Sequence, residues 1–166
     1  SIWNTTSIWF VSLSQRPRGR TLNPVWQERA GRAFNILEQQ HELLQQMFVL
    51  AVVFQVKHFV ADFPLQTRYM LQKTAASWAF MRPLGLHCFI HAALTLAIAA
   101  WIRPELWWLA LVDFGTHFIM DRVKSGPRYL GRYSNPQTSA FWLALGFDQM
   151  AHHITHLWIA WKLLGG

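Results

Sequence analysis

The sequence predicts an all-α protein: an integral membrane bundle of about four transmembrane helices, preceded by an N-terminal interfacial arm and an amphipathic helix. The first observation behind this prediction is composition. Hydrophobic residues make up 52% of the 166-residue chain, charged residues only 14%, and there are ten tryptophans, as is typical of helices that face lipid and carry aromatic belts at the membrane interfaces. The second is pattern, because apolar stretches near the roughly 20 residues that a hydrocarbon core requires alternate with basic connections.

The N-terminal part of the chain differs from the rest. Residues 1–15 are apolar and aromatic but too short to span a bilayer, and the basic residues follow this stretch, unlike those of a signal peptide. Residues 24–46 are polar with apolar residues at helical spacing, which favours an amphipathic helix along the membrane surface. We therefore interpret residues 1–42 as an interfacial or partner-binding extension and residues 43–166 as the transmembrane domain.

Four apolar stretches follow, and each is expected to form one membrane-spanning helix. A tight hairpin is expected between the second and third, because only Arg103, Pro104 and Glu105 separate them and proline is a strong stop signal. The stretches cover residues 43–63, 84–102, 106–120 and 140–164.

With four crossings, the two long connections lie on the same side of the membrane. Both are rich in lysine and arginine, so the positive-inside rule predicts that they face the cytoplasm. The formal charge of +7 comes mostly from residues between the apolar stretches, where it meets lipid headgroups, and we do not expect a nucleic-acid partner. The single cysteine, Cys88, excludes a disulfide framework.

The aspartates form a pattern with the histidines. All four lie in or at the ends of apolar stretches, and each has a histidine four residues away. Residues at this spacing share one helical face, so each pair can chelate a common centre. The pairs are His58 with Asp62, Asp113 with His117, His117 with Asp121, and Asp148 with His152, and the second helix adds His87 and His91.

This pattern predicts a buried metal site. All the pairs fall in the half of the bundle nearest the long connections, and an intramembrane aspartate costs ~2.5 to 3.5 kcal/mol unless it is compensated. A bound cation supplies that compensation, and imidazole with carboxylate suits zinc, manganese or iron. One or two divalent ions are expected. The candidate ligands are His58, Asp62, His87, His91, Asp113, His117, Asp121, Asp148 and His152.

The leading functional hypothesis is a metal-dependent hydrolase of a lipid-linked or amphiphilic ester or phosphoester. The metal would lower the pKa of a bound water, and Asp62 or Asp121 would accept its proton. Lys73 or Lys124 would hold the anionic group of the substrate.

Three alternatives stay open. In the first, the protein is a non-catalytic accessory subunit of a larger respiratory or photosynthetic membrane complex, held through residues 1–42. In the second, it is a di-iron membrane oxygenase. In the third, the polar residues form a metal-free network or proton path. The oxygenase is suggested by the histidine-box spacing of His87 with His91 and of His152 with His153 and His156. For His153 and His156 themselves, hydrogen bonding between helices is the preferred interpretation.

The spaced motifs resemble an uncharacterised family of bacterial and phage membrane proteins, domain of unknown function three-three-zero-seven. The resemblance covers roughly residues 47–164 and implies a protein of the bacterial inner membrane with no known activity. More loosely, the Asp-x-x-x-His pairs are similar to those of membrane proteins described as metal-dependent hydrolases. The motifs are the run 58–66, Lys73, His87 with His91, the run 113–121 with Lys124, and Asp148-Gln149 with His152.

Overall fold

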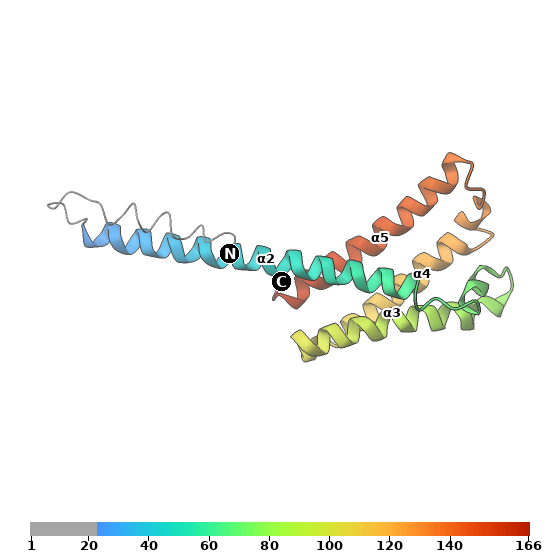
Figure 1. Cartoon of the computed structure of the whole chain (residues 1–166), viewed down its shortest axis with the longest axis horizontal. Helices are drawn as coiled ribbons and strands as arrows, with labels where there is room; N and C mark the ends of the chain where they lie inside the picture. The colour runs from blue at the N-terminus through green and yellow to red at the C-terminus, as the bar shows by residue number, and fades with distance from the viewer. Residues whose placement is uncertain (1–22) are drawn as a thin grey trace. The chain divides into compact units, whose positions relative to one another are not determined.

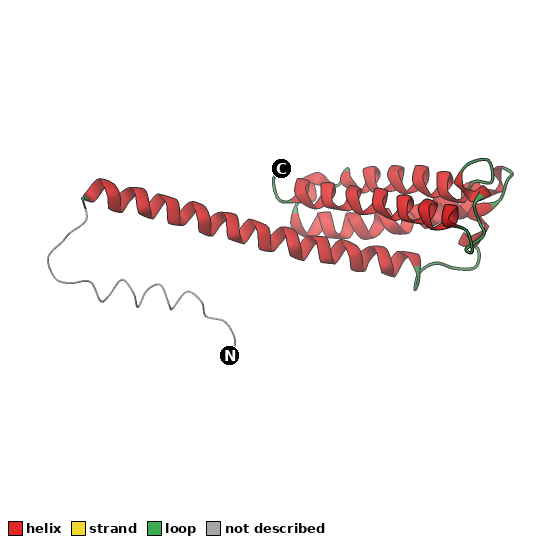
Figure 2. Cartoon of the chain, turned by 90° about the horizontal axis from the view of Figure 1, so that it is seen from above, coloured by secondary structure: helices red, strands yellow, loops and turns green. Residues whose placement is uncertain are grey.

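The computed structural model describes residues 23–166 and confirms the all-α fold class for this part of the chain, which contains no strand (Figure 2). The predicted arm at residues 1–22 lies outside the described residues. Short 3-10 turns, η1 (Met70–Thr74), η2 (Trp78–Phe80), η3 (Pro104–Leu106) and η4 (Leu130–Arg132), lie in the connections. The four α-helices are α2 (Pro24–Asp62), α3 (Met81–Ile102), α4 (Leu109–Ser125) and α5 (Ser139–Leu163).

Each predicted apolar stretch lies on one of these helices, with shifts of a few residues at the ends. The largest difference concerns α2, which joins the predicted amphipathic helix and the first predicted span into one helix, Pro24–Asp62. Proline suits the first position of a helix, and the Val25 backbone N–H donates a hydrogen bond to Asn23 Oδ1 at 2.9 Å.

The chain divides into two compact units, and the boundary falls between His41 and Glu42. Within the first unit, Arg32 forms an exposed ion pair with Glu28 at 3.0 Å, one helical turn away. Everything that follows on the core and the site concerns the second unit, Glu42–Gly166.

A tight hairpin joins α3 to α4, and the two helices lie side by side (Figures 1 and 2). Pro104 begins η3 directly after Arg103, whose Nε donates a hydrogen bond to Glu105 Oε1 at 2.8 Å. This interaction holds the pKa of the exposed Glu105 carboxyl below its usual range. The hairpin therefore ends where the sequence predicted, at a proline that cannot continue the helix.

Two apolar clusters lie at the two ends of the bundle. The cluster at the hairpin end is built from all four helices and consists of Leu50, Phe54, Ala99, Leu109, Ile159, Ala160 and Leu163. At the other end, Phe80, Leu84 and Cys88 pack together beneath the long connections. Arg122 links α4 to the connection before α3, because its guanidinium lies 3.6 Å from the Phe80 ring centre and donates a hydrogen bond to the Ala75 carbonyl. Polar side chains occupy the space between the clusters.

The bundle combines an extensively apolar surface with buried polar and charged residues. Large apolar residues are exposed on every helix, among them Phe63 at 69%, Phe89 at 61% and Leu143 at 74%. The buried polar and charged residues are Lys57, His58, His87, His91, Thr95, Asp113, His117, Asp121, Asp148, His152 and His156. In the described part of the chain, two helical stretches, Pro24–Asp62 and Trp78–Ile102, are long and apolar enough to cross a membrane.

Candidate metal centre

All nine predicted ligands lie in one cluster inside the bundle. They come from all four helices, and every one is buried except Asp62, whose side chain is 25% exposed. The i, i+4 pairs therefore turn inward together, as the helical spacing predicts. Within the described residues, three groups have ligand atoms within 4.8 Å of one another and can hold a metal ion. They are His58, His117 and His156; Asp62, His87 and His91; and Asp121, Asp148 and His152.

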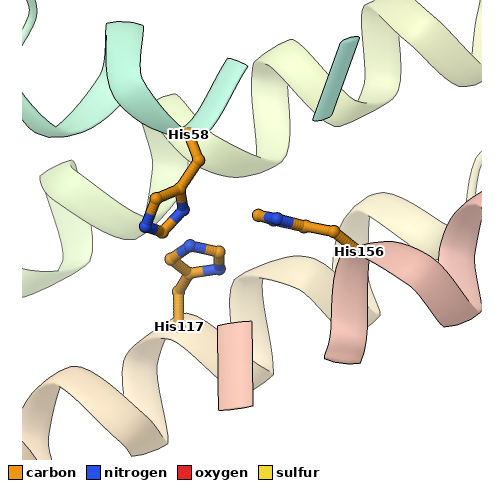
Figure 3. A group of neighbouring side chains, drawn as sticks. All are labelled: His58, His117 and His156. Carbon is orange, nitrogen blue, oxygen red and sulfur yellow. The ribbon is translucent and has the colours of Figure 1, made fainter. Parts of the chain in front are cut away.

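The first group is made only of histidines. His58, His117 and His156 come from α2, α4 and α5, and their rings meet at the centre of the bundle (Figure 3). His117 Nδ1 lies 3.0 Å from the backbone oxygen of Asp113, so its proton has an acceptor there. His117 Nε2 is buried with no hydrogen-bond partner among the described residues. That nitrogen is therefore available as a metal ligand.

Asp62 is surrounded by imidazoles. Its Oδ1 lies 3.1 Å from His91 Nε2 and 3.4 Å from His87 Nε2, and its Oδ2 lies 3.2 Å from His58 Nε2. Although close, His58 Nε2 makes no hydrogen bond with any described residue. Ligands about 2.0 to 2.1 Å from a tetrahedral zinc ion lie about 3.3 Å from one another. The separations around Asp62 suit hydrogen bonds, of which His91 Nε2 to Asp62 Oδ1 is one, and are also close to those between ligands of one ion.

Asp113 has a different environment, since it is fully buried and paired with a lysine. Its Oδ2 accepts a hydrogen bond from Lys57 Nζ at 2.6 Å and another from Thr95 Oγ1 at 2.7 Å. Its Oδ1 lies 3.1 Å from His117 Nδ1 and 3.2 Å from His156 Nε2, yet has no hydrogen-bond partner among the described residues. One carboxylate oxygen therefore faces cations and donors, and the other faces imidazoles.

Asp121 and Asp148 repeat this arrangement nearer the long connections. Lys73 Nζ donates to Asp121 Oδ2, and Lys124 Nζ donates to Asp148 Oδ2, both at 2.7 Å. His152 Nε2 lies between the two carboxylates, 3.5 Å from Asp121 Oδ1 and 3.3 Å from Asp148 Oδ1. The lysines predicted to hold substrate are thus bound to aspartates in this structure.

The four aspartates differ in whether a cationic side chain pairs with them. Asp113, Asp121 and Asp148 each pair with a lysine, whereas Asp62 forms an ion pair with no lysine or arginine of the described residues. A buried carboxylate needs a compensating charge or several hydrogen bonds. Asp62, a quarter exposed, is therefore the aspartate whose partners among the described residues are imidazoles and not an ammonium or guanidinium group.

A cavity of about 580 Å³ opens onto the exposed edge of the cluster. Asp62, Lys73, Asp121 and Lys124 line it, together with apolar residues of α2 and α5. These two helices diverge toward the long connections (Figure 1). A second cavity, of about 440 Å³, lies under η4 and shares both lysines and Asp121. The polar cluster is thus reached from the side on which the long connections lie.

Three buried residues of the cluster were missed by sequence reasoning: Lys57, Thr95 and His156. The available signal for Lys57 was a lysine in the interior of an apolar stretch, a position that is costly without a partner. His156, interpreted as a hydrogen bonder between helices, belongs to the histidine group. The interpretation of His153 remains untested; it lines the cavity with its ring centre 5.9 Å from that of His58.

No curated protein and no solved structure matches this chain significantly. A family described as "Protein of unknown function (DUF3307)" matches residues 49–165, well over half of the sequence. The matched region contains the four predicted spans, apart from residues 43–48 of the first. It also contains every residue of the three groups that can hold a metal ion. The match confirms the resemblance to domain of unknown function three-three-zero-seven, and the chain belongs to this family.

Proposed function

We propose that the protein is a membrane-embedded hydrolase that uses a divalent metal at Asp62 to cleave an amphiphilic ester or phosphoester. The observation that carries this proposal is the environment of Asp62. Its carboxylate has three imidazole nitrogens within 3.4 Å, pairs with no lysine or arginine of the described residues, and faces a cavity. A catalytic metal needs such a position, with protein ligands on one side and space for substrate on the other.

The exposed apolar side chains on all four helices, around a buried polar cluster, support placing these helices in the membrane. Exposed apolar patches of this extent mark contact with lipid or protein, and ionisable residues in membrane helices face the bundle interior. α4 has 17 residues and is about 25 Å long, close to the thickness of a hydrocarbon core. Its inward-facing Asp113, His117 and Asp121 lower its mean hydropathy without reducing the apolar surface that would face lipid.

The proposed ligands are Asp62, His58, His87 and His91. A zinc, manganese or iron ion bound there supplies an activated water and polarises the ester. Asp121 is the candidate base, because it lines the same cavity and His87 Nε2 lies 3.1 Å from its Oδ2. Lys73 donates to that oxygen and fixes the orientation of the carboxylate beside the cavity.

The cavity fits a substrate with one apolar and one polar end. Phe59, Phe63 and Leu145 provide an apolar wall that continues onto the exposed surfaces of α2 and α5. At the other end of the cavity lie the ammonium groups of Lys73 and Lys124, which suit an ester carrying negative charge. A lipid-like molecule would therefore approach between α2 and α5 with its headgroup beside the metal.

The metal is tested by elemental analysis of protein purified in detergent without chelators. We expect at least one equivalent of zinc, manganese or iron in the wild type and its loss in Asp62→Asn. Glu105→Gln, which removes an exposed carboxylate of the α3–α4 hairpin, is the matched control and should keep the metal. Wild-type protein with intact helical content and no bound metal would contradict the proposal. Iron together with oxygen-dependent product formation would favour the oxygenase instead.

Hydrolysis is tested with long-chain nitrophenyl phosphate and nitrophenyl carboxylate esters in mixed micelles. Turnover should require the metal and should fall by about 10² to 10⁴-fold in Asp121→Asn, as expected for loss of a general base. Because Asp121 is not among the proposed ligands, this variant should retain its metal. Equal rates in wild type and Asp121→Asn would remove Asp121 from the mechanism.

The accessory-subunit alternative is favoured by one observation of its own. In the first unit, α2 exposes Val25, Trp26, Phe34 and Leu37, each by more than half. Such side chains suit a protein partner as well as a lipid surface. Recovery of a stoichiometric partner from mild detergent, lost when these four residues are changed to serine, would support this role. Recovery of the protein alone under the same conditions would count against it.

A further inference from the structure

Lys57 occupies a position in the cluster that resembles that of a bound cation. It lies one residue before His58 on α2, and its side chain is 3% exposed. Its Nζ is 2.6 Å from Asp113 Oδ2, 3.3 Å from His156 Nε2 and 3.4 Å from His91 Nδ1. One carboxylate oxygen, which accepts a hydrogen bond from the ammonium, and two imidazole nitrogens thus surround this ammonium. A carboxylate and two imidazoles are also a common ligand set for a divalent metal.

Beside this ammonium lies an almost complete set of donor atoms. Asp113 Oδ1 and His117 Nε2 are both buried without a hydrogen-bond partner among the described residues. His156 Nε2 lies 3.2 Å from Asp113 Oδ1, and His58, already a proposed ligand of the ion at Asp62, lies beside His117 and His156 (Figure 3). The chain has therefore gathered more ligands than the ion at Asp62 can use.

We propose that Lys57 is an internal cation that masks a second, latent divalent-metal site formed by Asp113, His117 and His156. An ammonium so close to these ligands repels a divalent ion strongly, since a site excluded from water screens charge poorly. Wild-type protein then binds one ion, at Asp62, and Lys57 neutralises Asp113 in place of another. The inference takes the ion at Asp62 from the proposed function. The masking of the second site by Lys57 does not depend on that ion.

The other two lysines neutralise the third metal-competent group, because Lys73 Nζ and Lys124 Nζ donate to Asp121 and Asp148 at 2.7 Å. Their side chains are 16% and 37% exposed and line the cavities, whereas that of Lys57 is enclosed. Lys57 lies deep in the bundle, where its Nζ contacts residues of α3, α4 and α5, and it lines neither of the two cavities described above. Its ammonium therefore lies directly among the atoms that would bind a second ion.

The inference is tested by counting zinc. Purified wild type and Lys57→Met are loaded with zinc chloride in detergent, freed of unbound metal by gel filtration and measured by elemental analysis. Methionine has a similar length and no charge. We expect one equivalent in the wild type and two in Lys57→Met. The double variant Lys57→Met/Asp113→Asn should return to one, and Lys162→Met, which removes an amine near the C-terminus, should not change the count.

Each outcome decides the question. Two equivalents in wild type, one of them lost in Asp113→Asn, would overturn the masking role while leaving the ion at Asp62 intact. A Lys57→Met variant with wild-type helical content and no additional zinc would also overturn it. If that variant does not fold, the wild-type count and Lys57→Gln decide in the same way. A wild type that binds no zinc contradicts the proposed function, and a gain of one equivalent in Lys57→Met then still supports masking.

Discussion

At the scale of single residues, the cluster is organised by its carboxylates. Asp113 and Asp148 each present one oxygen to a lysine and the other to histidine, whereas Asp121 Oδ2 faces both Lys73 and His87 and its Oδ1 faces His152. Second partners of this kind fix the orientation of a ligand before the metal arrives. The lysines thus contribute to positioning as much as to charge.

The hydrogen bond from Thr95 to Asp113 offers a test of this positioning. We expect Thr95→Val to lower the free energy of unfolding by about 1.5 to 3 kcal/mol, the range for hydrogen bonds to charged groups, measured by denaturant unfolding in detergent. Thr116→Val is the control. Its hydroxyl donates only to the Val112 carbonyl of its own helix, so its loss should cost about 0.5 kcal/mol or less. Equal effects in the two variants would count against a special role for Thr95.

The sequence predicted which ligands share a helical face but not which side chains meet across helices. The i, i+4 spacing is a property of one helix, so the pairs of α2, α4 and α5 could be predicted from the sequence. Lys57 precedes His58 by one residue, about 100° around the helix, and only the packing of α2 against α4 brings it to Asp113. The contact of Thr95 with Asp113 could not be predicted either, because a threonine in an apolar helix is common and does not indicate a partner.

At the scale of helices, α2 is held to the bundle by its apolar part. Phe54 is fully buried, and its ring stacks on that of His156 with centres 5.3 Å apart. The same residue packs against Ile159 and Leu163 in the cluster at the hairpin end. One aromatic side chain therefore links the apolar core to the histidine group.

Phe54→Ala should remove this link. We expect a loss of about 3 to 5 kcal/mol in the free energy of unfolding, as for other buried phenylalanines, together with weaker metal binding because His156 and α2 lose their support. Val56→Ala, on the exposed side of the same helix, should change stability by less than about 0.5 kcal/mol. Thermal unfolding followed by circular dichroism in detergent measures both. A neutral Phe54→Ala would show that α2 is held by the polar contacts alone.

The helices themselves could be predicted closely because their ends carry signals. Pro104 ends the second predicted span, and the polar connection after Ser125 ends the third. No such signal separates residues 24–46 from the first span. The run Glu38-Gln39-Gln40-His41-Glu42 contains neither proline nor glycine and is made mostly of good helix formers. The change from polar to apolar composition there marks a change of environment, and the helix continues through it.

At the scale of the whole molecule, the proposed arrangement in the membrane makes a topological prediction. Cysteines placed at Ala76 and Ser134, in the two long connections, should react with a membrane-impermeant maleimide from one side, the cytoplasmic side. A cysteine at Glu105 should react only from the other. All three positions are exposed, and the native Cys88 is fully buried, so it should stay unlabelled. Labelling of Ala76 and Ser134 from opposite sides would contradict a four-span topology.

The three lysine–aspartate pairs also have an order in time. A ribosome makes Lys57 before Asp113, Lys73 before Asp121 and Lys124 before Asp148. As each of these acidic residues leaves the exit tunnel, its neutralising partner already exists upstream and can accompany it out of water. Asp62 has no lysine made before it as a partner, and His87 and His91 are made later. Under the proposed function its neutralisation awaits both the next helix and an ion from outside, so this centre would be completed late in biogenesis.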